Sequence, residues 1–191
     1  MTDAPEKRAV VAFCARLIPR KNGVLFSHAM KSCLADFPSL QVEIIGDGPD
    51  ESAMREILKT ELQAGRVNIA RSADPFSRLL PSAIFVSLIE PDNYPSQAVL
   101  EAMNCEAFLV LSNTGDSARF IQGGNGVLVD LDVTSIAAAI SDRLSNLPET
   151  VRMGQRNTKV LAEHFSERQY LDFLLDIYAF GKQHPRHERQ S

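Results

Sequence analysis

The sequence is poor in the residues that carry most cysteine, histidine and metal chemistry. It contains no tryptophan and only four histidines, and its three cysteines, Cys14, Cys33 and Cys105, form no Cys-x-x-Cys pair. Cysteines that are few, odd in number and widely spaced predict reduced thiols that pack as small apolar side chains. The histidines lack partners at the spacing of a Ser-His-Asp triad or a metal-ligand set, so neither a triad nor a metal site is expected.

Long apolar runs and a surplus of positive charge are also missing. No apolar run approaches the roughly 18–20 residues that span a bilayer, and the first seven residues hold no apolar signal-peptide core, so we expect a cytoplasmic chain without a transmembrane segment. Twenty basic and 24 acidic residues give a net charge of −4, which repels nucleic acid. An anionic ligand would therefore need a local basic pocket.

The chain does contain a regular alternation of two kinds of segment. Short apolar runs, typical of strands buried on both faces, occur at 9–14, 42–45, 67–69, 83–88, 108–111 and 126–129. Segments with helical periodicity lie between them, near 23–36, 50–63, 75–81, 96–104 and 116–122. This alternation predicts a doubly wound, Rossmann-like α/β domain, with a mostly parallel sheet of about six strands and helices on both faces.

The length of 191 residues fits one such domain. Residues 1–8 are predicted to form a polar leader, residues 9–180 the domain, and residues 181–191 a disordered polar tail. The domain is predicted to end in helices near 133–146, 149–163 and 166–180.

Ligands of open parallel sheets bind beyond the carboxyl ends of the strands, so the loops after the strands are the places to examine. The loop after the first strand carries Arg16, Arg20 and Lys21 just before a helix. Cations beside the free amides of a helix N-terminus can bind a phosphate, but a solvated turn explains them equally well.

The loop after the second strand reads Gly46-Asp47-Gly48-Pro49-Asp50. Glycines allow a close backbone approach to a ligand, Pro49 suits a first helical turn, and Asp47 or Asp50 can cap the helix. An ordinary strand-to-helix turn needs the same residues, and that interpretation is favoured for this motif taken alone.

The loop after the fourth strand is the most informative stretch. Glu90 and Asp92 can accept hydrogen bonds from hydroxyl groups, and Ser96 can cap a helix whose first amides then face a ligand. Glu101 follows on the first turns of that helix. Carboxylates beside an anion-binding helix start suit a ligand that has both phosphate and sugar hydroxyls.

Four motifs in this order resemble one family. They are Arg16-Leu17 with Lys21 and Gly23, Ile44-Ile45-Gly46-Asp47-Gly48-Pro49, Asn93-Tyr94-Pro95-Ser96-Gln97 with Leu100-Glu101-Ala102-Met103, and Gly126-Val127-Leu128-Val129. Their spacing is similar to that of the C-terminal domain of group 1 glycosyltransferases, which are retaining enzymes of GT-B architecture, family 4. The resemblance runs from about residue 9 to residue 180.

The resemblance implies that the domain binds a UDP- or GDP-sugar donor, without a metal or other cofactor. Arg16 and Lys21 would contact the diphosphate and stabilise the leaving group, and the amides at Ser96 and Gln97 would contact the distal phosphate. Glu101 would accept hydrogen bonds from the ribose, and Glu90 or Asp92 from the transferred sugar. The rest of the implied substrate site is Gly46, Asp47, Gly48, Asn93, Tyr94 and Pro95.

The sequence departs from the family pattern at several positions. The family places two glutamates eight residues apart, but the residue eight before Glu101 is Asn93, so the first acid must be Glu90 or Asp92 in a longer loop. Asn22 interrupts the usual Lys-Gly pair, and Arg119 stands where a glutamate is frequent.

Two functions remain open at this stage. The chain is either the donor-binding half of a glycosyltransferase or a nucleotide-sugar-binding or interaction module without turnover. In the first case, a missing or separate N-terminal domain would hold an acceptor of unknown kind and supply any peripheral membrane contact. A dinucleotide-dependent oxidoreductase is not favoured, because no Gly-x-Gly-x-x-Gly follows the first strand.

Overall fold

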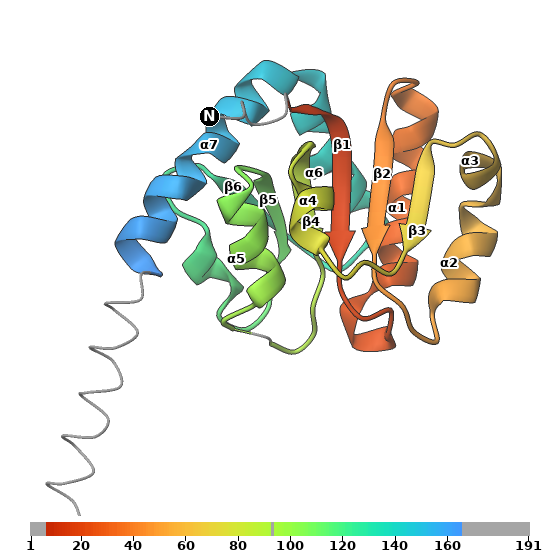
Figure 1. The fold of residues 1–191 in the computed structure, drawn as a ribbon, viewed down its shortest axis with the longest axis horizontal. Helices are drawn as coiled ribbons and strands as arrows, with labels where there is room; N and C mark the ends of the chain where they lie inside the picture. The colour runs from red at the N-terminus through yellow and green to blue at the C-terminus, as the bar shows by residue number, and fades with distance from the viewer. Residues whose placement is uncertain (1–6, 93, 166–191) are drawn as a thin grey trace, which may run out of the picture.

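A computed structural model describes residues 7–92 and 94–165. Six strands form one parallel sheet in the order β3-β2-β1-β4-β5-β6 (Figure 1). The strands are β1 (Arg8–Cys14), β2 (Gln41–Ile45), β3 (Val67–Ala70), β4 (Ser82–Ser87), β5 (Phe108–Ser112) and β6 (Gly126–Val129). The prediction of a doubly wound, Rossmann-like sheet of about six strands is confirmed.

The helices lie close to their predicted positions, with two differences. They are α1 (Gly23–Asp36), α2 (Glu51–Ile57), α3 (Lys59–Gln63), α4 (Pro75–Leu79), α5 (Gln97–Asn104), α6 (Val133–Ser145) and α7 (Leu147–His164). Short 3-10 turns form η1 (Pro19–Lys21) and η2 (Ser117–Phe120). The predicted helix 50–63 is divided at Leu58, where the carbonyl of Ile57 accepts a hydrogen bond from Lys31 Nζ at 3.0 Å.

The predicted helix 116–122 is the 3-10 turn η2 instead, because only four residues adopt helical geometry there, a length typical of 3-10 turns. At the start of α6, Asp132 occupies the cap position and accepts a hydrogen bond from Ser135 N at 2.8 Å. The predicted helix 166–180 and tail 181–191 lie outside the described residues, as do the first six residues of the predicted leader. Its last two are described: Lys7 donates to three backbone carbonyls, and Arg8 opens β1.

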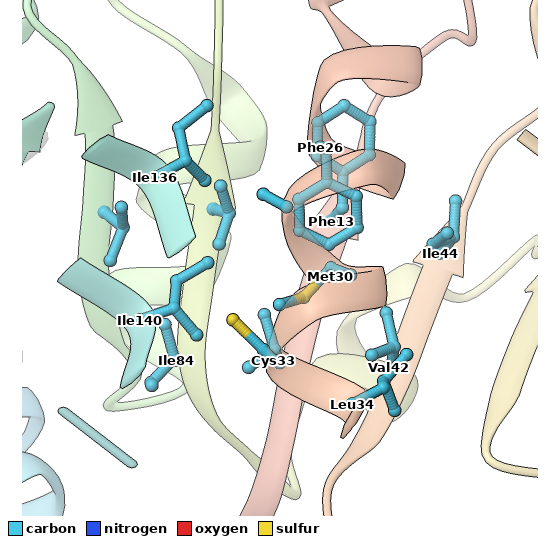
Figure 2. Packing of buried hydrophobic residues seen from close by; sticks show 14 of the residues in the cluster. Phe13, Phe26, Met30, Cys33, Leu34, Val42, Ile44, Ile84, Ile136 and Ile140 are labelled. Atoms are coloured by element: carbon cyan, nitrogen blue, oxygen red, sulfur yellow. The ribbon is translucent and has the colours of Figure 1, made fainter. Parts of the chain in front are cut away.

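Two apolar layers cover the two faces of the sheet. On one face, α1, α2 and α6 pack over Phe13, Ile44 and Ile84. Figure 2 shows Phe26 of α1 against Phe13, with Ile136 and Ile140 of α6 to one side. On the other face, α4, α5 and α7 cover a second cluster that includes Leu109. The sheet is therefore fully sandwiched, and ligand access is left to its edges and loops.

The three cysteines are unpaired and pack among other side chains, as their spacing in the sequence predicts. Cys33 and Cys105 are buried among apolar side chains, Cys14 is half-buried, and none forms a disulfide. Within residues 7–92 and 94–165, no helix combines the length and apolar character needed to cross a membrane.

Polar contacts fix α7 against the sheet. Asn157 is fully buried, donates to Ala107 O at 2.7 Å and accepts a hydrogen bond from Asn125 at 2.6 Å. One turn earlier, Gly154 lies directly against the backbone between Glu106 and Phe108. The close approach of α7 therefore depends on a residue without a side chain and on a buried amide pair.

Candidate functional site

A cleft of about 510 Å³ lies at the carboxyl ends of β1 to β4, the lower edge of the sheet in Figure 1. Its walls come from the loops after β1, β2 and β3, from the end of β4 and from the first turns of α5. Among the described residues, none after β5 or β6 lines it. Since β1 has β2 on one side and β4 on the other, the cleft covers the point where the strand order reverses, where open α/β sheets bind ligands.

The cleft is rich in positive charge. Four cationic side chains, Arg16, Arg20, Lys21 and Arg71, line it together with two carboxylates. Burial lowers the pKa of Lys21 from its ordinary value of 10.5, and the neighbouring charges of Arg20 and Arg16 lower it further. A cation crowded by other cations is stabilised by a bound anion, so the cleft favours a negatively charged ligand.

The turn that presents these cations is set by Asn22. Its φ of 54° places it in the left-handed region, and its backbone amide closes η1 on Pro19 O at 2.9 Å. Its side-chain amide donates to Leu88 O at 3.1 Å, at the end of β4. Asparagine tolerates this backbone conformation better than most residues, which explains why it can interrupt the Lys-Gly pair of the family pattern.

The glycines of the second loop pack against the first loop. A Cβ on Gly46 would lie 3.0 Å from the carbonyl carbon of Ala15, and one on Gly48 would lie 2.8 Å from that of Leu17. Gly46 and Asp47 line the cleft, whereas Gly48 supports it from outside the lining. The side chain of Asp50 occupies the cap position of α2 without making a capping bond, so the expected aspartate cap is not formed.

The start of α5 faces the cleft. Ser96 is 7% exposed and lines the cleft at the cap position, but its hydroxyl makes no capping bond, contrary to the sequence-based expectation. Gln97 and Ala98 also line the cleft, so the first-turn amides of α5, which have no partner within their own helix, lie beside it. Gln97 Nε2 donates to Glu101 Oε1 at 2.9 Å, and both side chains line the same wall.

Cys14 lies at the end of β1 and also lines the cleft. Burial raises the pKa of its thiol to about 11, and the nearby charge of Glu101 contributes to the shift. The thiol is therefore protonated at neutral pH.

The loop after β4 lies beside the cleft rather than in its lining. Glu90 is exposed, and its carboxylate makes no hydrogen bond or ion pair with any residue in the described ranges. Asp92 Oδ1 instead accepts hydrogen bonds from the amides of Tyr94 at 3.1 Å and Asp116 at 3.4 Å. A Cβ on Gly115 would collide with the Asp92 side chain, so that glycine is required by this contact.

Tyr94 is an aromatic anchor for the same loop. Its ring centre lies 5.0 Å from that of Phe120 and 6.3 Å from that of Phe165, and the Arg119 guanidinium sits 4.5 Å above it. The arginine that replaces the family's frequent glutamate therefore stacks on this ring.

The structure brings together eight of the residues named from the sequence. They are Arg16, Arg20, Lys21, Gly46, Asp47, Ser96, Gln97 and Glu101. Glu90, Asp92, Tyr94 and Pro95 belong to the neighbouring loop, and Asn93 lies outside the described residues. Sequence reasoning missed Cys14, Arg71, Ser72 and Ser87, each at or just after the carboxyl end of a strand, where the same rule could have found them.

A second, smaller cavity of about 160 Å³ lies over β1, β2 and β3 toward their amino ends. Glu43 and Arg78 form an ion pair at its wall, and burial raises the pKa of Glu43 despite that partner. Among the described residues, no group of three or more His, Cys, Asp and Glu side chains could hold a metal ion.

These features define an α/β domain with a cationic ligand cleft at the switch point of a doubly wound sheet. Residues 8–146 match the family model described as glycosyl transferases group 1, so the chain belongs to the group 1 glycosyltransferases. A comparison with curated protein sequences gives no significant match.

Solved structures of glycosyltransferases share the fold at low identity. Staphylococcus aureus TarM, in a complex that contains UDP, matches with a TM-score of 0.81 and 17% identity over 92% of this chain and 37% of that one. Anabaena HepE, in complex with UDP and glucose, matches with a TM-score of 0.69 and 20% identity over 88% of this chain and 48% of that one. This chain therefore spans less than half of either protein.

A third match concerns a single domain. The C-terminal domain of LpcC, a group 1 family glycosyltransferase from Francisella tularensis, matches with a TM-score of 0.71 and 18% identity over 85% of this chain and 88% of that domain. The fold is thus that of one half of a GT-B enzyme, as the resemblance predicts.

Proposed function

We propose that the cleft binds the diphosphate of a UDP- or GDP-sugar, and that the chain is the donor-binding half of a retaining glycosyltransferase. The observation that carries this proposal is the meeting of Arg16, Lys21 and the N-terminus of α5 around one cleft at the switch point. The complexes of TarM and HepE with UDP support it by fold. The acceptor would be held by an N-terminal domain or a partner chain, and a cytoplasmic location fits the unpaired thiols.

The proposed chemistry uses charge that is already in place. When the bond between the sugar carbon and the phosphate oxygen breaks, the electron pair stays on the diphosphate. Arg16 and Lys21 would stabilise that charge, and the first amides of α5 would contact the distal phosphate. The proposal assigns this role to side chains and not to a metal ion.

The carboxylates would form hydrogen bonds with the uncharged parts of the donor, the ribose and the transferred sugar. Glu101, held by Gln97 on the cleft wall, would accept hydrogen bonds from the ribose hydroxyls. Gly46 and Asp47 would border the nucleoside on the β2 side.

A panel of UDP, GDP and their sugars in a thermal-shift experiment tests the proposal, since a ligand of the folded state raises its stability by mass action. A folded chain that responds to none of them would contradict it.

The transferred sugar would contact Glu90 rather than Asp92. Asp92 already accepts two backbone amides, whereas the Glu90 carboxylate has no hydrogen-bond or ion-pair partner among the described residues. We expect Glu90→Gln to weaken binding of a nucleotide sugar about 10-fold while leaving binding of the free nucleotide unchanged, because a hydrogen bond to a charged group contributes roughly 1.5–3 kcal/mol. Calorimetry with UDP and UDP-glucose, or GDP and GDP-mannose, measures both.

Asp92→Ala is the matched variant for this prediction. It should lower the melting temperature, since the amides of Tyr94 and Asp116 lose their acceptor. A selective loss of sugar affinity in Asp92→Ala, with none in Glu90→Gln, would reverse the assignment.

Nucleotide affinity should fall at alkaline pH. Because the pKa of Lys21 is below its ordinary value, the ammonium loses its proton at a lower pH than an exposed lysine does, and the diphosphate then loses one cation. We expect the affinity of Lys21→Arg to stay constant over the same range, since a guanidinium remains charged. Titrations from pH 7 to pH 10 compare the two proteins, and parallel pH profiles would contradict this role for Lys21.

The alternative is a binding module without turnover. The chain spans 37% of TarM and 48% of HepE, so the activity of a whole GT-B enzyme is not shown for it. Transfer and donor-hydrolysis assays on the chain alone, and then with an N-terminal GT-B half, separate the two functions. Turnover in either assay excludes the alternative.

A further inference from the structure

Three hydrogen bonds join the η1 turn to the loop after β4. The amide of Glu90 donates to Arg20 O at 3.0 Å, and Arg20 Nη2 donates to Asp92 O at 2.9 Å. Asn22 Nδ2 donates to Leu88 O at 3.1 Å. The two segments lie about 70 residues apart in the sequence, yet they are bonded at both the backbone and the side-chain level.

The stem of the β4 loop is fixed independently from its other side. Ser112 Oγ accepts a hydrogen bond from Ile89 N at 3.0 Å and donates to Ile89 O at 2.9 Å, and Thr114 Oγ1 also donates to Ile89 O. This anchor on β5 does not involve η1. The contacts of Arg20 therefore concern the part of the loop that follows Ile89 and carries the two acids.

Arg20 also has a place in the cleft. It lines the wall beside Lys21, and its charge is one cause of the lowered pKa of Lys21. Arg71 is another cation of the same cleft, but it lies after β3, and its ion-pair partner is Asp47 at 3.7 Å. Of these two arginines, only Arg20 forms hydrogen bonds with the loop after β4 that carries Glu90 and Asp92.

We propose that Arg20 is a positioning residue that couples the two ends of the donor site, by holding the Glu90–Asp92 segment at a fixed distance from the cations of the diphosphate. This inference rests on the proposed function. It assigns to Arg20 a role that the four motifs do not, and it explains how a loop longer than the family pattern keeps its acids beside the cleft. The guanidinium of Arg20 donates to one acceptor on this loop, the backbone carbonyl of Asp92. A lysine at position 20 can therefore replace part of the contact.

The test compares Arg20→Met with Arg71→Met. Each variant removes one cation from the cleft, so both should weaken binding of UDP or GDP. We expect Arg20→Met to weaken binding of the matching sugar nucleotide, UDP-glucose or GDP-mannose, roughly 10-fold more than binding of the free nucleotide. The reason is that the released loop no longer holds Glu90 in place, so the hydrogen bond between the sugar and this charged group is lost. Arg71→Met should weaken both by the same factor, and Arg20→Lys should recover part of the sugar-dependent affinity.

Amide hydrogen exchange provides a readout that does not need a ligand. The acceptor of the Glu90 amide is the backbone carbonyl of residue 20, which every substitution retains. Faster exchange of the Glu90 amide in Arg20→Met, with unchanged exchange in Arg71→Met, is the expected result, because the loop is then released from the guanidinium.

The outcomes separate the two claims. Equal losses of nucleotide and sugar-nucleotide affinity in Arg20→Met, or a wild-type chain that binds nucleotides but not their sugars, would overturn the role of Arg20 and leave nucleotide binding intact. A folded wild-type chain that binds none of the four probes would overturn the proposed function, and the role of Arg20 with it.

Discussion

Alanine at both Arg16 and Lys21 is expected to reduce the affinity for a nucleoside diphosphate at least about 100-fold, because each charge-assisted contact contributes roughly 1.5–3 kcal/mol. Both side chains line the cleft beside the N-terminus of α5. The loss should exceed that of any other pair of substitutions in the cleft, since these two cations border the switch point itself. Isothermal titration calorimetry with UDP and GDP measures the effect.

Arg152→Ala is the control for this variant. Arg152 lies on α7, its side chain is 72% exposed, and its ion-pair partner is Glu149 on the same helix. Removing it changes the net charge of the protein by one without touching the cleft, so nucleotide affinity should stay the same. If the double variant binds as tightly as Arg152→Ala, the diphosphate does not lie at Arg16 and Lys21.

The largest effect on stability is expected for Gly154→Ala. A methyl group at this position would lie 2.9 Å from Phe108 N and 3.1 Å from the carbonyl carbon of Ala107, and closer still to Glu106 O. All three are backbone atoms that cannot rotate away, so α7 would have to move off the sheet. Overpacking of this kind costs about 2 kcal/mol, which lowers the melting temperature by roughly 4–8 °C in a protein of this size.

Gln155→Ala provides the comparison on the same helix. Gln155 is exposed, so its replacement should change stability by less than about 0.5 kcal/mol. Alanine normally favours a helix over glycine by about 1 kcal/mol. A Gly154→Ala variant that is more stable than the wild type would therefore show that α7 does not pack as closely as described.

The strands and the order of the layers follow from the sequence because their physical cause is local. A strand buried on both faces must be apolar throughout, so runs such as Ala9–Cys14 are visible without knowledge of their neighbours. The helix 23–36 is predicted at its observed bounds because its cause is local too: its buried side chains recur with the period of a helix and lie on one face. The break at Leu58 could not be predicted, because it accompanies a contact of Ile57 with Lys31 on another helix.

The candidate site could be predicted only in part. Alternation of strands and helices places the loops after β1, β2 and β4 at one edge, which suffices to bring Arg16, Asp47 and Glu101 together. The direction of each side chain depends on packing between distant segments. Tyr94 packs against Phe120 and Phe165, and this contact is invisible in the spacing of the loop residues.

A crystal structure of the chain with a bound nucleoside diphosphate tests the central claim most directly. We expect the diphosphate within hydrogen-bonding distance of Arg16, Lys21 and the first amides of α5, with the ribose beside Glu101. A nucleotide bound elsewhere, for example in the cavity beside Glu43 and Arg78, would contradict the assignment of the cleft as the donor site.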